Sequence, residues 1–192
     1  HMSNVSSTAG RMPVQGTAYA IILAVSFCHM VNDIMQSLLS AIYPMLKEEF
    51  RLDFWQIGLL TLAFMVTASL LQPLVGIYTD KRPMPYSLTF GMGMSMIGLI
   101  LLAVAHSYWL LFVGACFIGV GSSIFHPESS RVARLASGGR FGLAQSLFQV
   151  GGNFGQALGP LLAAFIVVPL GQGSVGWFAL AAVLGMGILF QV

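Results

Sequence analysis

The stretch YAIILAVSFCHMVNDIMQSLLSAIYPML, residues 19–46, decides the fold class. It is longer than the roughly 20 mainly apolar residues that carry a helix across a bilayer, and Asp33 is its only charged residue. Its polar side chains recur every three or four positions, so on a helix they lie on one face. They are His29, Asn32, Asp33, Gln36, Ser37 and Ser40. The stretch therefore predicts a membrane-spanning helix with one polar stripe.

The rest of the chain has the same character. Of its 192 residues, 57% are hydrophobic and 7% are charged, whereas soluble domains typically carry about 25% charged residues. No stretch alternates apolar and polar residues in the manner of a β-barrel strand. Five further apolar stretches are long enough to span a membrane: residues 56–78, 85–105, 108–127, 141–168 and 175–191. We predict an all-α membrane protein whose six transmembrane helices form one domain, residues 17–192.

Residues 1–16 have neither apolar periodicity nor a signal-peptide core, and His1 with Met2 resembles a cloning scar. We expect them to form a mobile leader. With the leader inside, six of the eight Lys and Arg residues fall on the cytoplasmic side, where loops are enriched in such residues. This distribution predicts that both termini are cytoplasmic. The abrupt stop at Val192, at the end of the last apolar stretch, suggests that the chain is a fragment.

Other classes of protein lack support in the sequence. The formal charge of +2 includes no basic run with interleaved aromatic residues, so nucleic acid is not an expected partner. Cys28 and Cys116 each lie in an apolar run without a second thiol or a metal-spaced histidine, and we expect inert buried thiols. There is no nucleophile elbow, phosphate-binding glycine loop or recognisable set of metal ligands. We therefore expect no enzyme activity, no cofactor and no metal.

The polar stripe of the first helix is the main candidate for function. An ionisable side chain at the bilayer centre costs at least a few kcal/mol, so Asp33 should face the bundle interior, a partner or a water-filled cavity. We interpret Asp33, His29, Asn32 and Gln36 as residues of a proton or substrate pathway. Hydrogen bonding between helices is the alternative for the neutral members.

The fifth stretch repeats the pattern with neutral amides. Gln145, Gln149, Asn153 and Gln156 fall on one helix face. Amides donate and accept hydrogen bonds, which suits a solvated substrate wall and equally suits contacts between helices. We place Gln145, Gln149 and Asn153 in the pathway.

The fourth stretch approaches the cytoplasm with titratable groups beside Pro127. Proline frees backbone carbonyls and bends or ends a helix, and a histidine exchanges protons near neutral pH. His126 is therefore a candidate proton relay. Glu128 and Arg131 are candidates for a cytoplasmic gate, the alternative being a solvated pair that contributes little.

Two motifs resemble those of the major facilitator superfamily of transporters. Between the second and third helices, Gly76, Asp80 and Lys81 match its pattern of a glycine, three residues, an aspartate and a basic residue. On the fifth helix, Gly155, Gly159 and Pro160 are similar to its antiporter motif. The wider run, especially residues 125–160, looks like the fosmidomycin resistance branch of that superfamily.

That resemblance implies the N-terminal six-helix half of a twelve-helix fold, built from two three-helix repeats in a bacterial inner membrane. It implies alternating access and proton-coupled efflux of a small polar drug, such as a fosmidomycin-like antibiotic. Asp80 and Lys81 would interlock with the second half, Gly76 would allow close packing, and the antiporter motif would shape the interface between halves. A non-transporting half module, assembled as a parallel homodimer or with a second half, is the alternative, and a passive pore is a weaker one.

The sequence also departs from that family. After Lys81 the usual glycine and basic pair are replaced by Met84, Pro85 and Tyr86, which weakens the expected interlock. The fourth-helix arginine common in antiporters would fall near Ala115 and is absent. The proton chemistry is therefore expected at Asp33 and the neighbouring histidines.

Overall fold

The computed structural model describes residues 16–82 and 84–191, so the leader predicted over residues 1–16 lies outside them except for Gly16. The described part contains six helical segments long and apolar enough to cross a membrane, which confirms the predicted fold class. Their elements are α1 (Tyr19–Ala41), α3 with α4 (Phe54–Ser69, Leu71–Lys81), α5 (Ser87–Val104), α6 (Tyr108–Leu135), α7 with η1 and α8 (Phe141–Leu162, Ala163–Val167, Val168–Leu170), and η2 with α9 (Gln172–Trp177, Phe178–Gln191).

Prolines account for most differences from the predicted boundaries. The first span ends at Ala41, and a short helix α2 (Tyr43–Glu49) begins with Pro44 in its first turn, where a missing N–H costs nothing. Pro73 cannot donate to the carbonyl of Ser69, and the second span is interrupted between α3 and α4. Pro127, in contrast, lies inside α6, which continues to Leu135.

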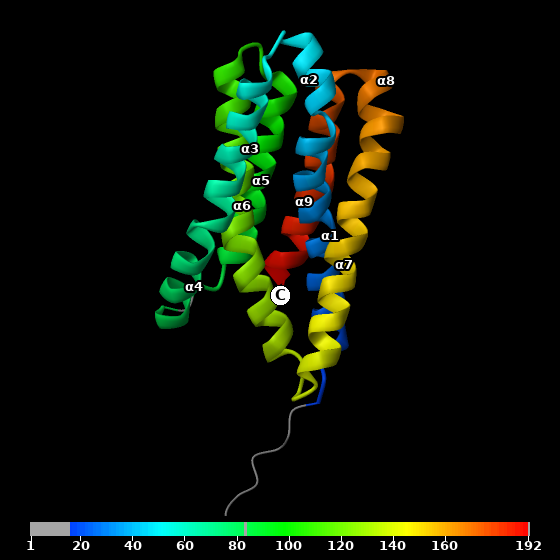
Figure 1. Cartoon of the computed structure of the whole chain (residues 1–192). Helices are drawn as coiled ribbons and strands as arrows, with labels where there is room; N and C mark the ends of the chain where they lie inside the picture. Colours follow the sequence, from blue (N-terminus) through cyan, green and yellow to red (C-terminus); the bar gives the residue numbers. More distant parts are fainter. Residues whose placement is uncertain (1–15, 83, 192) are drawn as a thin grey trace, which may run out of the picture.

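The helices form a bundle in which α1 and α7 lie side by side along most of their length, while α4 diverges from the others at one end (Figure 1). The core follows α1, whose contacts include α5, α6, α7 and α9. Helix α6 contacts α3, α4 and α5 as well. Helices α1 and α6 are therefore the two central helices of the bundle.

The two ends of the bundle differ in composition. One end carries three tryptophans, each more than 60% exposed. They lie at the start of α3, at the start of α6 and just before α9: Trp55, Trp109 and Trp177. Tryptophan is enriched where a helix meets the membrane surface. The opposite end carries the C-terminal ends of α4 and α6, where Lys81, Arg82 and Arg134 lie. One end is thus aromatic and the other basic.

Glycines on α7 allow its backbone to approach α1 closely. A Cβ atom at Gly155 would lie 2.3 Å from the carbonyl oxygen of Met30, and one at Gly151 would lie 2.3 Å from that of Ser26. Gly159 likewise faces Ser37 of α1. The recurrence of glycine every fourth residue therefore serves a close helix contact inside this half of the fold.

We expect Gly155→Ala to destabilise the bundle by roughly 1–3 kcal/mol, the usual cost of overpacking. The added methyl group meets backbone atoms of Met30, which cannot rotate away. Gly187→Ala is the matched control, because a Cβ at this helical glycine of α9 has nothing within 4 Å. Thermal unfolding in detergent, followed by circular dichroism, should separate the two variants; equal melting temperatures would contradict the proposed contact.

Candidate functional site

The carboxylate of Asp33 lies at the meeting point of α1, α6 and α7, with its residue 1% exposed. The Nε2 atom of His126 lies 3.1 Å from Oδ1, and the Nε2 atom of His29 lies 3.4 Å from Oδ2. The amide of Gln156 donates to Oδ2 at 3.2 Å. We call Asp33, His29, His126 and Gln156 the acid cluster. It brings together polar groups from three separate spans.

Backbone carbonyls fix the protonation of both imidazoles on the side away from Asp33. Nδ1 of His29 lies 2.7 Å from the carbonyl oxygen of Phe148, and Nδ1 of His126 lies 3.0 Å from that of Ser122. A carbonyl oxygen only accepts, so each Nδ1 carries the hydrogen. Both Nε2 atoms are then left to face the carboxylate.

This arrangement has room for an additional proton. A neutral imidazole protonated at Nδ1 presents a lone pair at Nε2, which repels the lone pairs of an ionised carboxylate. The contacts at 3.1 and 3.4 Å become attractive when a proton sits on an imidazole or on the carboxyl group. Because Asp33 and His29 are buried, an unpaired charge or lone pair here would be costly. The acid cluster is therefore suited to binding and releasing a proton.

The ring of His29 is held in place by two residues that lie one turn apart on α7. Phe148 stacks on it with ring centroids 3.9 Å apart. At Gly152, a Cβ atom would lie 2.3 Å from the imidazole, so only glycine leaves room for the ring. Sequence reasoning did not select Phe148 or Gly152, because both look like ordinary packing residues of an apolar helix.

Two further residues of the α1 stripe, Asn32 and Gln36, lie beside the cluster. Asn32 is fully buried and donates to Oδ1 of Asp33 at 3.3 Å, while its own Oδ1 has no hydrogen-bond partner among the described residues. Gln36 donates to the hydroxyl of Ser122 at 2.9 Å, and this hydroxyl lies 3.0 Å from Nδ1 of His126. Asn32 and Gln36 thus join His29 and Asp33 at one site, together with Ser122, which was not selected from the sequence. Of the other stripe residues, Ser37 donates to the carbonyl of Gly155 and Ser40 is exposed.

The amide stripe of α7 divides among three places. Gln156 reaches the acid cluster, although it was not among the pathway residues selected from the sequence. Gln145 pairs with Ser130 near the basic end through two hydrogen bonds of 3.1 Å. Gln149 donates to Asn153 at 3.3 Å, and both residues are exposed. Gln149 and Asn153 therefore lie on an open face of α7 and form no hydrogen bond with Asp33 among the described residues.

Glu128 and Arg131 join α6 to neighbouring helices at the basic end. Their side chains pair at 2.7 Å, and the glutamate side chain is 4% exposed. Arg131 also donates to the carbonyl of Thr79 at 2.9 Å and lies 3.7 Å from the carboxylate of Asp80, while Ser87 donates to Glu128 at 2.9 Å. Burial of Glu128 argues against the solvated-pair alternative, since the carboxylate relies on these partners.

Removing one partner of this pair should be costly. We expect Arg131→Gln to destabilise the bundle by roughly 1–3 kcal/mol, because Glu128 is left buried without its cation. The double variant with Glu128→Gln should recover part of that loss. Arg134→Gln, at an exposed position of the same helix, is the control. Thermal unfolding of the unmodified chain, both single variants Arg131→Gln and Glu128→Gln, and the double variant measures the coupling, and additive effects of the two substitutions would contradict it.

A polar cleft of about 260 Å³ lies between α4 and α6. The histidine of the acid cluster on α6, His126, lines it and has a side chain that is 23% exposed. Arg131 and Asp80 also line the cleft, as does Gly76, where a Cβ would have nothing within 4 Å. The cleft thus brings His126, the motif residues of α4 and the Glu128–Arg131 pair to one surface.

The acid cluster contains a group of side chains spaced as metal ligands are. Among the described residues it is the only such group of His, Cys, Asp and Glu. Donor atoms of His29, Asp33 and His126 all lie within 4.8 Å of one another. A shared proton satisfies the same lone pairs, and Gln156 supplies the carboxylate with a further hydrogen bond. The sequence predicts no metal, and it did not reveal this spacing, because His126 comes from α6 and the other two residues from α1.

A buried acid with two histidines in a bundle of membrane-spanning helices is the kind of site found on substrate, ion or proton pathways. Comparison with known families gives the class directly: the model of the Major Facilitator Superfamily matches residues 25–192. The chain belongs to this superfamily, as the two sequence motifs predicted. Its relatives are transporters and not enzymes.

Two curated relatives align with nearly the whole chain. The fosmidomycin resistance protein of Escherichia coli is 55% identical over 98% of this chain and 46% of its own length. An uncharacterized MFS-type transporter of Bacillus subtilis is 47% identical over 92% of this chain and 43% of its own length. The chain therefore spans less than half the length of the curated relatives it matches.

Solved structures show the same fold at lower identity. The peptide transporter POT, solved with sulfate, is 20% identical with a TM-score of 0.75 over 89% of this chain and 37% of that structure. A bacterial homologue of the human lysosomal transporter Spinster is 15% identical with a TM-score of 0.73 over 92% of this chain and 43% of that structure. These similarities concern the fold alone.

Proposed function

We propose that this chain is one half of a proton-coupled exporter of small polar drugs that works by alternating access. The observation that carries the proposal is the acid cluster, in which two Nε2 atoms face one buried carboxylate at 3.1 and 3.4 Å. Such a cluster binds a proton in one state and releases it in another. The polar cleft lined by His126 supports a proton route toward the basic end of the bundle.

Similarity to a relative and the exposed amides support the proposed substrate class. A relative 55% identical to this chain is named a fosmidomycin resistance protein, and fosmidomycin is a small polar compound. Gln149 and Asn153 lie on the open face of α7, where amides suit hydrogen bonds to a polar ligand. We assign these two residues to the drug site and the acid cluster to the proton.

A complete site requires a partner. Transporters of this class bind near the membrane midplane between two halves related by an axis along the membrane normal, and this chain spans less than half of its relatives. The exposed amides and the open position at Gly76 support contact with a second six-helix half. A parallel homodimer would place the same face at the interface and is the second candidate.

The orientation is part of the proposal. Bacterial relatives indicate an inner membrane. Lys81, Arg82 and Arg134 gather at one end, and cytoplasmic ends are enriched in such residues. We therefore place both termini in the cytoplasm, with the three exposed tryptophans at the outer surface.

Reconstitution in vesicles distinguishes a half of an active transporter from a non-transporting half module. The chain is placed in proteoliposomes either alone or with the part of the Escherichia coli relative that it does not cover, and fosmidomycin flux is followed under an imposed pH gradient. We expect proton-driven flux only from the pair. No flux from the pair, with both parts folded and inserted, would favour the non-transporting module, whereas flux without saturation or proton dependence would favour a passive pore.

A further inference from the structure

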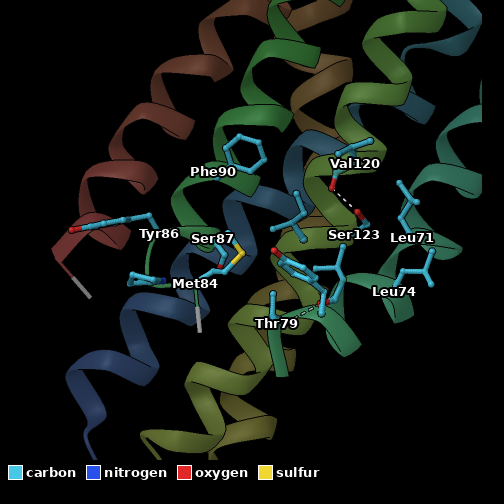
Figure 2. Close-up of a pocket in the computed structure, with 13 residues that line it drawn as sticks. Leu71, Leu74, Thr79, Met84, Tyr86, Ser87, Phe90, Val120 and Ser123 are labelled. Carbon is cyan, nitrogen blue, oxygen red and sulfur yellow. Dashed lines mark hydrogen bonds between the residues drawn. The ribbon is translucent and has the colours of Figure 1, made fainter. Parts of the chain in front are cut away.

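An apolar groove of about 560 Å³ lies between α4, α5 and α6. Its volume is within the roughly 300–1,000 Å³ of pockets that hold small molecules. Figure 2 shows Leu71 and Leu74 of α4 at one side of the groove, and Tyr86 and Phe90 at the other. Because the chain spans a membrane, we expect an open apolar groove between its helices to be filled by the hydrocarbon chain of a lipid.

The groove occupies only one of the two faces of α4. Leu71, Leu74, Val75 and Tyr78 line it, and their spacing places them on one side of the helix. Gln72, Gly76 and Asp80, also one turn apart, line the polar cleft instead. The polar face is the one suited to a second half, since it carries the motif residues. The apolar face is then left toward lipid.

Two cations follow the groove residues of α4 in the chain. Lys81 and Arg82 are exposed and lie in the chain between two groove residues, Tyr78 and Met84. The guanidinium of Arg82 lies 5.7 Å from the centre of the Tyr78 ring. Among the described residues, the neighbouring Asp80 carboxylate is paired with Arg131 instead of either cation. An apolar slot followed in the chain by two cations complements an acyl chain that ends in a phosphate.

We propose that this groove binds one anionic phospholipid from the leaflet at the basic end of the bundle. One acyl chain fills the space between α4 and α5, and the phosphate is held by Lys81 and Arg82. The lipid braces α4, which diverges from the other helices at this end (Figure 1). The replacement of the usual motif residues by Met84, Pro85 and Tyr86 then has a structural role, because all three line the groove.

Native mass spectrometry of the six-helix chain tests the proposal. The probes are dioleoyl phosphatidylglycerol and dioleoyl phosphatidylcholine at equal concentration in detergent. We expect one phosphatidylglycerol to be retained in preference, with a preference of about fivefold contributed by each cation. Lys81→Gln with Arg82→Gln should abolish the preference, while Lys47→Gln with Arg51→Gln at the other end should not. Leu74→Trp should displace both lipids, unlike Leu180→Trp on the exposed face of α9.

Three results would overturn the proposal. One is a phosphatidylglycerol preference that survives the loss of both cations at Lys81 and Arg82. Another is retention of both lipids in a folded Leu74→Trp variant, with folding checked by circular dichroism. The third is displacement of the lipid by a co-expressed second half, which would assign the groove to a helix.

Discussion

Asp33→Asn should remove the response of fosmidomycin export to a pH gradient in the two-half assembly. If protons entering through the acid cluster drive the exchange, the unmodified assembly should export faster when the outside is acidic. Asparagine has nearly the same shape and keeps a hydrogen-bonding group toward His126 and Gln156, yet it cannot take up a proton. We expect proton-driven export to fall by roughly 100-fold, as when a positioned proton-transfer group is lost.

The control for this variant is Glu49→Gln, which makes the same chemical change at an exposed carboxylate of α2. Equal melting temperatures for Asp33→Asn and the unmodified chain would show that folding is intact. An unchanged rate with an unchanged pH response in Asp33→Asn would remove this residue from the mechanism.

The second large effect is expected for His126→Gln. His126 is the member of the acid cluster that faces the polar cleft, whereas the His29 side chain is 3% exposed and closed off by Phe148. Glutamine preserves a donor toward Oδ1 of Asp33 but does not titrate. We therefore expect proton-driven export to fall at least about tenfold, while drug exchange without a pH gradient continues.

His106→Gln is the matched control, since His106 is exposed in the connection between α5 and α6. Proton-driven export and gradient-free exchange are measured on the same vesicles, so that coupling is separated from binding. If His126→Gln and His106→Gln behave alike in both assays, the route from the cleft to Asp33 is wrong.

The fold could be predicted from the sequence because a bilayer imposes a simple rule. Any span must be long, apolar and helical, so six stretches and their approximate bounds follow from composition. Periodicity also placed His29, Asn32 and Asp33 on one face of α1, and they do lie together. What a single helix determines is therefore visible in the sequence.

Contacts between helices could not be predicted in the same way. His126 reaches Asp33 across 93 positions of the chain, and Gln156 reaches it across 123. Their approach depends on how far and in which rotation α6 and α7 pack against α1. Glycines set that distance, for example at Gly152 beside the His29 ring, but a glycine in a sequence does not say which neighbour it faces.

The burial of Glu128 could not be predicted from the sequence either. In the sequence, a glutamate three positions before an arginine near a helix end suggests a solvent-exposed ion pair. In the structure it is covered because α4 and the start of α5 meet α6 at this point, which brings Thr79 and Ser87 to the pair. Glu128 is covered because α4 lies against α6. The position of α4 depends on the interruption of the second span near Pro73, which a sequence pattern does not place.

The measurement that tests the central claim most directly is infrared difference spectroscopy of the six-helix chain in lipid as pH is changed. If Asp33 and its two histidines share an exchangeable proton, a carbonyl-stretch band of a buried protonated carboxyl group should appear on acidification. It should be absent in Asp33→Asn, altered in His126→Gln and retained in Glu49→Gln. A spectrum in which Asp33→Asn and the unmodified chain change identically with pH would contradict the proton site.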